Sequence, residues 1–246
     1  ARVLKCGKKI NGAIEGERYI VTWGLGHLVT LADPEDYDKK YKEWKIDVLP
    51  MKPAPFKLEV IKQTGKQFAA VKTQIHRKDV NEIIIATDAG REGELVARLI
   101  LEKAGSKKPI KRLWISSVTD KAIREGFAKL KNGHEYDALY DAAMCRAEAD
   151  WLVGINATRA LTCKYNAQLS CGRVQTPTLA MIAKREEKIR SFIPEGYYGM
   201  TAKGQNIMLT WQDQKSKSYR SFDKEKMTGL MKKLDGQKAV VEEIKK

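Results

Sequence analysis

The chain has 246 residues, 43% of them hydrophobic and 31% charged, a balance that excludes a disordered polypeptide and fits one large domain or two smaller ones. Lysine and arginine number 46 against 31 acidic residues, and the formal net charge of +15 indicates a polyanionic partner such as nucleic acid, the alternative being a solvated basic surface. No apolar stretch is long enough to cross a bilayer and no signal-peptide pattern opens the chain, so we expect a cytoplasmic protein without a membrane partner.

The first half of the chain alternates strand-like and helix-like patterns. The β-branched and aromatic residues of Tyr19–Leu31 predict a strand that enters a glycine turn. The run EIIIATD, Glu82–Asp88, is typical of a strand buried on both faces of a parallel sheet. The other expected elements are an irregular stretch at 33–55, a helix over 65–77, a helix marked by Leu95, Ala97, Leu99 and Leu101, a strand at 110–116 and a helix opened by Thr119 that runs to Lys131. This alternation predicts an α/β domain at 1–134 with a mostly parallel sheet.

After residue 133 the pattern becomes continuously helical. Two long helices are expected, over 136–165 and 174–189, and Pro177 is tolerable only in the first turn of the second. From residue 197 the alternation is strand-like, with a short helix at 224–234 and a last strand at 238–244. We therefore expect a helical segment at 135–195 and the start of an antiparallel β-rich domain at 196–246.

Three carboxylates follow the apolar strand at 82–88 within seven residues. Asp88 ends the strand, and Glu92 and Glu94 fall in the first turn of the next helix, where a carboxylate is also an ordinary dipole-stabilising feature. In an open α/β sheet, functional groups gather at the carboxyl ends of strands. Gly90 and Gly93 keep side-chain bulk away from this bend, as the approach of a hard cation and a phosphate requires. The residues alone leave a Mg²⁺ site and a structural role open.

The stretch TDAGREGE resembles the acidic motif of Toprim domains, in a form typical of type IA DNA topoisomerases. Four further segments resemble the topoisomerase III branch of that family: TWGLGHLVTL, RLWISSVT, RAEADWLVGINATRA and SCGRVQTPTL. The resemblance covers essentially the whole chain. It implies a Toprim-like fold, Mg²⁺ as cofactor, single-stranded DNA as partner, association with the nucleoid, and strand cleavage and rejoining through a 5′-phosphotyrosine link. No glycine-rich P-loop occurs, which agrees with a reaction without ATP.

The chain departs from the family pattern at three places. The catalytic Glu of the first Toprim strand is expected upstream of Ala1, and the second Asp of the acidic motif is Gly90. Asp88 and Glu92 remain as the expected metal ligands, with Mg²⁺ held mostly by water and substrate phosphate. None of the nine tyrosines is followed two residues later by Arg-Thr, as the family's nucleophile motif requires. We therefore expect an amino-terminal fragment that binds single-stranded DNA but cannot cut it.

The helical segment supplies the expected DNA contacts. Arg146, Asp150 and Thr158 are spaced by multiples of four and share a helix face, where Arg146 and Asp150 also fit a plain ion pair. In the loop SCGRVQ, Gly172 permits close backbone approach and the polar side chains can donate to phosphates, the alternative being a helix cap. With what the resemblance implies, the predicted DNA-binding residues are Trp44, Arg91, Arg146, Asp150, Trp151, Asn156, Arg159, Ser170, Cys171, Gly172, Arg173, Val174 and Gln175.

Two single residues and two other functions complete the predictions. Trp44, in the lysine-rich KKYKEWK, can stack on a base or pack in the fold. The resemblance implies that His27 lies near the acidic cluster and orients a phosphate. A Toprim nuclease or primase, and a non-catalytic module for single-stranded DNA, are the alternative functions. The exposed strand edges expected after residue 196 are also suited to pairing with another chain.

Overall fold

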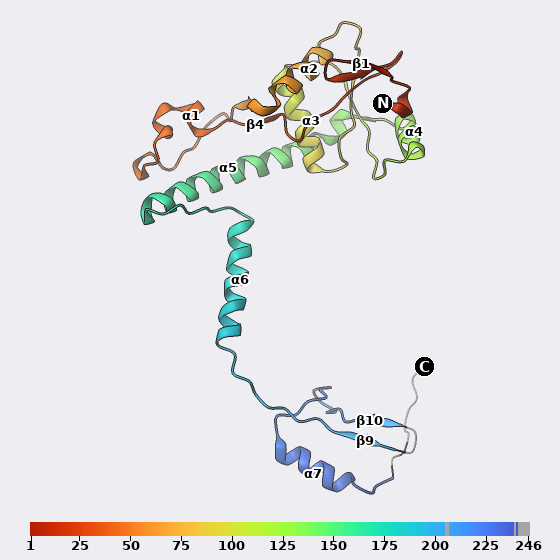
Figure 1. Cartoon of the computed structure of the whole chain (residues 1–246), viewed down its shortest axis with the longest axis vertical. Coiled ribbons are helices and arrows are strands. Elements are labelled where there is room, and N and C mark those ends of the chain that lie inside the picture. The colour runs from red at the N-terminus through yellow and green to blue at the C-terminus, as the bar shows by residue number, and fades with distance from the viewer. Residues whose placement is uncertain (205–206, 239, 241–246) are drawn as a thin grey trace. The chain divides into compact units, whose positions relative to one another are not determined.

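The structure is a computed structural model that describes residues 1–204, 207–238 and 240 (Figure 1). The chain divides into two compact units, Ala1–Leu179 and Ala180–Lys246. The strand predicted at 238–244 lies outside the described residues, except for Lys238 and Val240. Within the described parts, no helix combines the length and apolar character that crossing a membrane requires.

The first unit contains three small sheets. They are β1 (Lys8–Ile10), β2 (Ala13–Glu15) and β3 (Ile20–Thr22) in one antiparallel sheet, β4 (Val29–Leu31) antiparallel to β5 (Leu58–Val60), and β6 (Ile83–Ile85) parallel to β7 (Ile110–Arg112), with β8 (Lys131–Asn132) antiparallel to β7. The predicted α/β class is confirmed, but in place of the expected mostly parallel sheet only β6 and β7 pair parallel, and the other strand pairs of this unit are antiparallel. β6 and β7 are joined by a helical crossover, as a parallel pair requires, whereas short turns join β1 to β3 and make them antiparallel.

Five α-helices lie within this unit, and a sixth begins in it. They are α1 (Pro34–Tyr37), α2 (Gly65–Ile75), α3 (Arg91–Ala104), α4 (Asp120–Ala128), α5 (Asp137–Tyr165) and α6 (Gln175–Arg190). The hydroxyl of Thr119 accepts a hydrogen bond from the amide of Ala122, so the predicted cap of α4 is confirmed. The predicted end at Lys131 is wrong, because Lys131 pairs with Arg112 of β7 and belongs to β8. The other long helices lie within a few residues of their predicted bounds.

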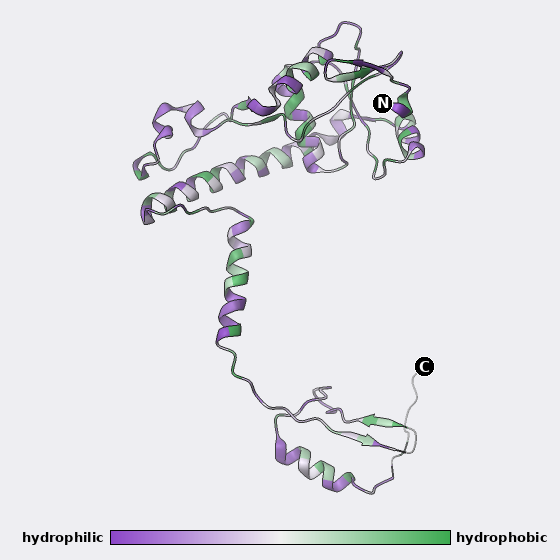
Figure 2. Ribbon diagram, in the orientation of Figure 1, coloured by the Kyte–Doolittle hydropathy of each residue, from purple (hydrophilic) through white to green (hydrophobic). Residues whose placement is uncertain are grey.

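The apolar core forms where α3 packs against α5 and the strands β4 and β5. The four residues that predicted α3 are all buried in it: Leu95, Ala97, Leu99 and Leu101. Leu28, just before β4, Val29 of β4 and Phe68 of α2 also belong to this core. Figure 2 shows this arrangement as hydrophobic residues on α3, whereas α5 alternates hydrophobic and hydrophilic residues along its length. α3 is therefore the central helix of the unit.

The second unit contains the remainder of α6, two strands and a helix. β9 (Thr201–Lys203) and β10 (Met208–Thr210) pair antiparallel, Tyr198 bridges to Ser221, and α7 spans Lys224–Leu234. The side chain of Asp223 caps α7 by accepting from the amide of Lys226 at 2.8 Å. The antiparallel pairing and the helix agree with the predictions for residues after 196.

A fully buried ion pair lies at the junction of α3, β6 and β7. Arg112 Nε donates to Glu94 Oε2 at 2.8 Å, and both side chains have no exposed surface. Arg98 Nε donates to the other oxygen of Glu94 at 2.9 Å. The two terminal nitrogens of the Arg112 guanidinium donate to four backbone carbonyls, those of Ile85, Thr87, Asp88 and Leu113. Burial lowers the pKa of Arg112, and the facing carboxylate of Glu94 opposes this shift.

We predict that Glu94→Gln destabilises the protein by about 3–5 kcal/mol, because it leaves the buried guanidinium of Arg112 without its counter-charge. Urea unfolding followed by circular dichroism measures the free energy. The control is Glu125→Gln, which removes the same charge from an exposed i,i+4 pair with Lys121 and should cost about 0.5 kcal/mol or less. Equal effects of the two substitutions would contradict the structural role of the buried pair.

Candidate metal and nucleic-acid site

The bend between β6 and α3 presents Asp88 on a fixed backbone. Arg112 Nη2 donates to the carbonyl of Asp88 at 2.6 Å, and the amide of Gly90 donates to the same oxygen at 3.0 Å. Thr87 Oγ1 donates to the carbonyl of Gly93 at 2.7 Å and fastens the bend to the start of α3. The Asp88 side chain is exposed and has no hydrogen bond or ion pair within the part of the chain that the structure describes. The carboxylate is therefore free while its backbone is held.

The two glycines of the bend differ in how much space surrounds them. A Cβ at Gly93 would lie far inside van der Waals contact with the backbone of Asp88, so the close approach of the bend to α3 requires glycine there. A Cβ at Gly90 would meet nothing within 4 Å, and the backbone of Gly90 is extended, with φ 178°. The prediction that both glycines exclude bulk is therefore supported at Gly93 alone.

Glu92 lies in the first turn of α3, between two basic side chains. Arg146 Nη1, from α5, donates to Glu92 Oε1 at 3.0 Å. His27 Nε2, just before β4, lies 4.0 Å from Glu92 Oε2. The structure thus brings His27 and Arg146, from distant parts of the sequence, to the acidic bend.

Glu92 and Arg146 begin a series of alternating charges, here called the chain of charges, that continues along α5 to the loop before α6. Arg146 Nε lies 3.8 Å from Asp150 Oδ2, and the other carboxylate oxygen of Asp150 accepts a hydrogen bond from Arg173 Nε. The guanidinium of Arg173 holds the pKa of Asp150 below its ordinary value, and Asp150 raises the pKa of Arg173. Acidic and basic groups therefore alternate from Glu92 to Arg173, and they connect the acidic bend with the loop.

The loop Ser170–Val174 is anchored to α5 through its backbone. Thr158 Oγ1 accepts from the amide of Cys171 at 2.9 Å and donates to the carbonyl of the same residue at 3.2 Å. Gln175 Nε2 donates to Ser170 Oγ at 2.6 Å, and the amide of Gly172 donates to Thr176 Oγ1 at 3.1 Å. Arg173 and Val174 stay exposed. The loop therefore presents its side chains on a backbone fixed at Cys171 and Gly172.

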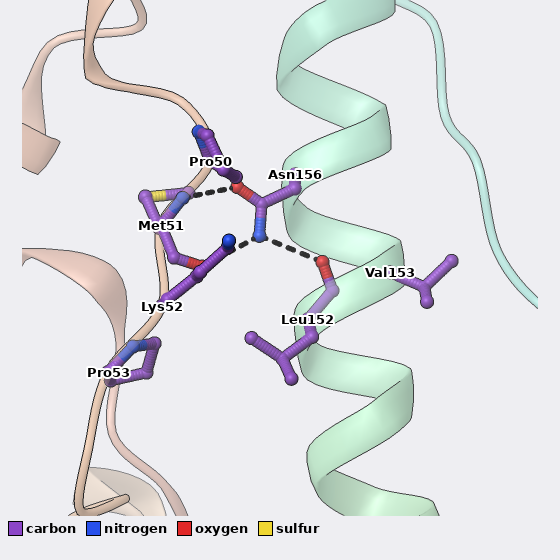
Figure 3. A pocket seen from close by; sticks show the side chains of 7 residues that line it. All are labelled: Pro50, Met51, Lys52, Pro53, Leu152, Val153 and Asn156. Carbon is purple, nitrogen blue, oxygen red and sulfur yellow. Dashed lines mark hydrogen bonds between the residues drawn. The ribbon is translucent and has the colours of Figure 1, made fainter.

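Asn156 is predicted to contact DNA, but its side chain holds a backbone segment of the same unit. Its Oδ1 accepts from the amide of Met51 at 2.6 Å, and its Nδ2 donates to the carbonyls of Met51 and Leu152, both at 2.9 Å. Figure 3 shows these bonds beside an open hollow of about 380 Å³ between residues 50–53 and α5. The amide of Asn156 therefore fixes residues 50–53 against α5.

Four other predicted residues are not members of the chain of charges. Trp151 is buried, donates from Nε1 to the carbonyl of Ala32 at 3.0 Å and packs edge-on against two aromatic rings, those of Tyr37 and Phe56. Arg159 is 6% exposed and donates to the carbonyl of Tyr41. Trp44 is 50% exposed, and Arg91 is exposed at the start of α3. The structure thus places Trp151 and Arg159 within the fold, and Trp44 and Arg91 at the surface.

The sequence predictions did not identify Arg112 or Arg98 as part of the site, although Arg112 fixes the backbone of Asp88. The available signal was an arginine inside the predicted strand IKRLWIS, a position where a charge needs a buried partner. Within the described residues, no group of three or more His, Cys, Asp or Glu side chains converges as a metal site. Asp88 and Glu92 are carboxylates of the kind that Mg²⁺ binds, one or two at a time together with water and phosphate.

Comparisons with known proteins agree with this geometry. Residues 6–118 match the Toprim domain family, and residues 134–246 match the DNA topoisomerase family. The full-length topoisomerase I from Thermotoga maritima has the same fold over 88% of this chain and 34% of its own, with a TM-score of 0.60 and 24% identity. In this chain a segment that matches the Toprim domain family is thus followed by a segment that matches the DNA topoisomerase family.

Curated relatives named DNA topoisomerase 3 match the whole chain. The chain is 67% identical over 246 residues to DNA topoisomerase 3 of Bacillus subtilis and 64% identical to that of Bacillus licheniformis. The chain is therefore similar over its whole length to topoisomerase III proteins. Each match covers the whole chain but 34% of the relative, so the chain spans about a third of the length of these relatives.

We predict that Gly93→Ala destabilises the protein by about 1–3 kcal/mol, because the new methyl group forces the Asp88 backbone away from α3. The same change should weaken Mg²⁺ binding, measured by titration calorimetry. Gly90→Ala is the matched control: its extended backbone accepts any residue, so stability should stay within about 1 kcal/mol of the wild type. A larger cost at Gly90 than at Gly93 would contradict the geometry of the bend.

Proposed function

We propose that this chain is the part of a DNA topoisomerase III that binds Mg²⁺ and single-stranded DNA. In the whole enzyme one DNA strand is cleaved and rejoined through a 5′-phosphotyrosine link, without ATP, for relaxation and decatenation of DNA at the nucleoid. The observation that carries this proposal is the unbroken series of charges from Glu92 to Arg173 beside the free carboxylate of Asp88. It joins a cation-binding end to a phosphate-binding end on one surface.

At the acidic end, Asp88 and Glu92 fit a magnesium ion. Asp88 offers an exposed carboxylate whose backbone is held by Arg112, and Glu92 lies in the first turn of the following helix. When bound, Mg²⁺ supplies positive charge to the oxygens of a phosphodiester. His27 and Arg146 lie close enough to Glu92 to orient its carboxylate, and they are suited to donate to the same phosphate.

At the basic end, Arg173 and Arg146 fit the DNA backbone. Both arginine side chains are 40% exposed, and their partners Glu92 and Asp150 are 62% and 42% exposed. Exposed ion pairs are weak, about 0–1 kcal/mol, so a phosphate can replace Asp150 as the partner of Arg173 at little cost. Ser170 and Gln175 add neutral hydrogen-bonding groups beside Arg173. Contacts of this kind read no base sequence.

The alternative functions fit the second half of the chain less well. A Toprim nuclease or primase requires the acidic bend but not the segment 134–246, which matches the DNA topoisomerase family. A non-catalytic module describes this chain by itself, because none of its nine tyrosines occurs in a Y-x-R-T-like sequence. The proposed activity therefore belongs to the whole enzyme and the proposed binding to this chain.

We predict that Asp88→Asn weakens Mg²⁺ binding by at least about tenfold, the lower end of the loss caused by removing even an outer partner of a metal ligand. The fold should be preserved, because Arg112 binds the backbone of Asp88 and not its carboxylate. Titration calorimetry with MgCl₂ measures the affinity. Asp141→Asn removes the same charge from an exposed position on α5 and serves as the control. Unchanged affinity in Asp88→Asn would exclude this carboxylate as a ligand.

We predict that Arg173→Ala weakens binding of single-stranded DNA equally for different base sequences. The slope of log affinity against log salt should fall by about 0.7, the contribution of one phosphate contact to a single strand. Fluorescence anisotropy of labelled oligonucleotides at several salt concentrations provides both values. Arg124→Ala, which removes an arginine from a surface pair on α4, is the matched control.

The same samples test the division of labour between this chain and the whole enzyme. With Mg²⁺ present and after quenching in detergent, no covalent protein–DNA band should form. A covalent band would show that one of the nine tyrosines is a nucleophile, and shortened oligonucleotide without a band would support the nuclease alternative. A wild-type slope in Arg173→Ala would support the helix-cap role of the loop.

A further inference from the structure

The lysine-rich segment Lys39–Lys45 presents Trp44 away from the chain of charges described above. The segment consists of a 3₁₀ turn at Lys39–Lys42 followed by extended residues, and the side chain of Trp44 is half exposed. Two side chains of α5 bind the backbone of this segment. Arg159 Nη1 donates to the carbonyl of Tyr41, and Cys163 Sγ donates to the carbonyl of Trp44 at 3.3 Å. The indole is therefore held on a fixed backbone.

Arg159 is an unusual support for this segment, because it is buried without an acidic partner. Its exposed fraction is 6%, its Nε has no hydrogen bond, and no carboxylate lies within ion-pair distance among the described residues. Burying an unpaired charge is expensive. The guanidinium is 5.1 Å from the centroid of the Trp44 ring, so the cation–π contact with the indole offsets part of this cost. Arg159 therefore supports the Trp44 ring from within the fold.

The charges around Trp44 suit a polyanion. Lys40 and Lys45 are paired with acidic neighbours of the same segment, Asp38 and Glu43. Lys39 and Lys42 are exposed and have no ion-pair partner among the described residues. An exposed indole that follows two such lysines in the same segment combines the two features of single-strand binding, a stacking face for bases and positive charge for the backbone.

We propose that Trp44 is a stacking platform for a base of single-stranded DNA, with Arg159 as its buried positioning residue and Lys39 and Lys42 as contacts for the flanking phosphates. This inference rests on the proposed function and adds a binding subsite that lies outside the acidic bend and the loop before α6. The platform is tolerant of base identity, because every base presents a π face. It gives Arg159 a different role from the phosphate contact expected from the sequence.

The experiment compares a thymidine oligonucleotide with one of the same length that contains a run of abasic sites. Trp44→Ala should lower the affinity for the thymidine strand by about fivefold or more, and it should leave the affinity for the abasic strand unchanged. The salt slope should stay the same for both strands, because the indole carries no charge. Trp44→Phe should keep most of the affinity. Trp23→Ala, at a tryptophan that is 42% exposed, is the matched control and should leave the ratio of the two affinities unchanged.

Two further variants separate stacking from phosphate contact. Arg159→Lys keeps the charge but loses the planar face under the indole, so it should reproduce the selective loss on the thymidine strand. Lys42→Ala should weaken binding of both strands and lower the salt slope by about 0.7. Circular dichroism and urea unfolding verify that each variant is folded. A salt slope lowered by about 0.7 in Arg159→Ala, which removes the charge, would overturn the positioning role and make Arg159 a phosphate ligand.

The outcomes also distinguish this inference from the function on which it rests. Equal losses on both strands in Trp44→Ala would show that Trp44 is structural, and the platform would be wrong. If the wild type binds thymidine and abasic strands equally, the platform falls while the proposed function stands. If the wild type binds no single-stranded DNA at any salt concentration tested, the proposed function itself fails and the platform fails with it.

Discussion

The buried pair of Glu94 and Arg112 is the interaction on which the candidate site depends. Arg112 lies in β7 and Glu94 in α3. The guanidinium of Arg112 also donates to the backbone carbonyls of Ile85, in β6, and of Asp88. A buried charge persists only when its hydrogen-bonding groups are satisfied, and here the groups that satisfy it are the backbone of the functional bend. The core and the site are therefore built around the same side chains, and the exposed carboxylate of Asp88 is positioned from beneath.

α5 connects this core to the residues that we propose to bind DNA. Its first half packs on α3, and the successive turns carry Arg146 and Asp150 to the surface and Asn156 and Arg159 against residues 41–51. One rigid helix thus holds the acidic bend, the loop before α6 and the segment around Trp44 on a common frame. The mixed polarity of α5 follows from these contacts, because different faces of the helix meet apolar and polar neighbours along its length.

The sequence predicted the helices better than the sheets. The helices α2, α3 and α5 have apolar periodicity, caps or terminal signals that act locally, and their bounds follow from those signals. The strands are two or three residues long, so the pairing partner decides their direction, and for the strands from β4 to β8 that partner lies far away in the sequence. Lys131 illustrates the difference: its local context continues a helix, whereas its neighbour in space is β7.

The candidate site was predicted where it depends on spacing and missed where it depends on burial. Asp88 and Glu92 follow from the motif and the pair of Arg146 with Asp150 from helical spacing, and the structure places Arg146 beside both Glu92 and Asp150. The burial of Arg112 and Arg159 could not be predicted in this way, because whether a charge lies inside or outside depends on the partner that the fold brings to it. For Arg112 that partner is an acid, and for Arg159 it is an aromatic ring.

Gly90 shows that shape and charge at the acidic bend are independent of each other. The position has an extended backbone and open space around it, so the glycine is not a requirement of the fold, in contrast to Gly93. The resemblance to Toprim motifs implies an acid at this position, and a Cβ there would meet no atom within 4 Å. The number of carboxylates at the bend can therefore change through this single position while the folding free energy remains nearly constant.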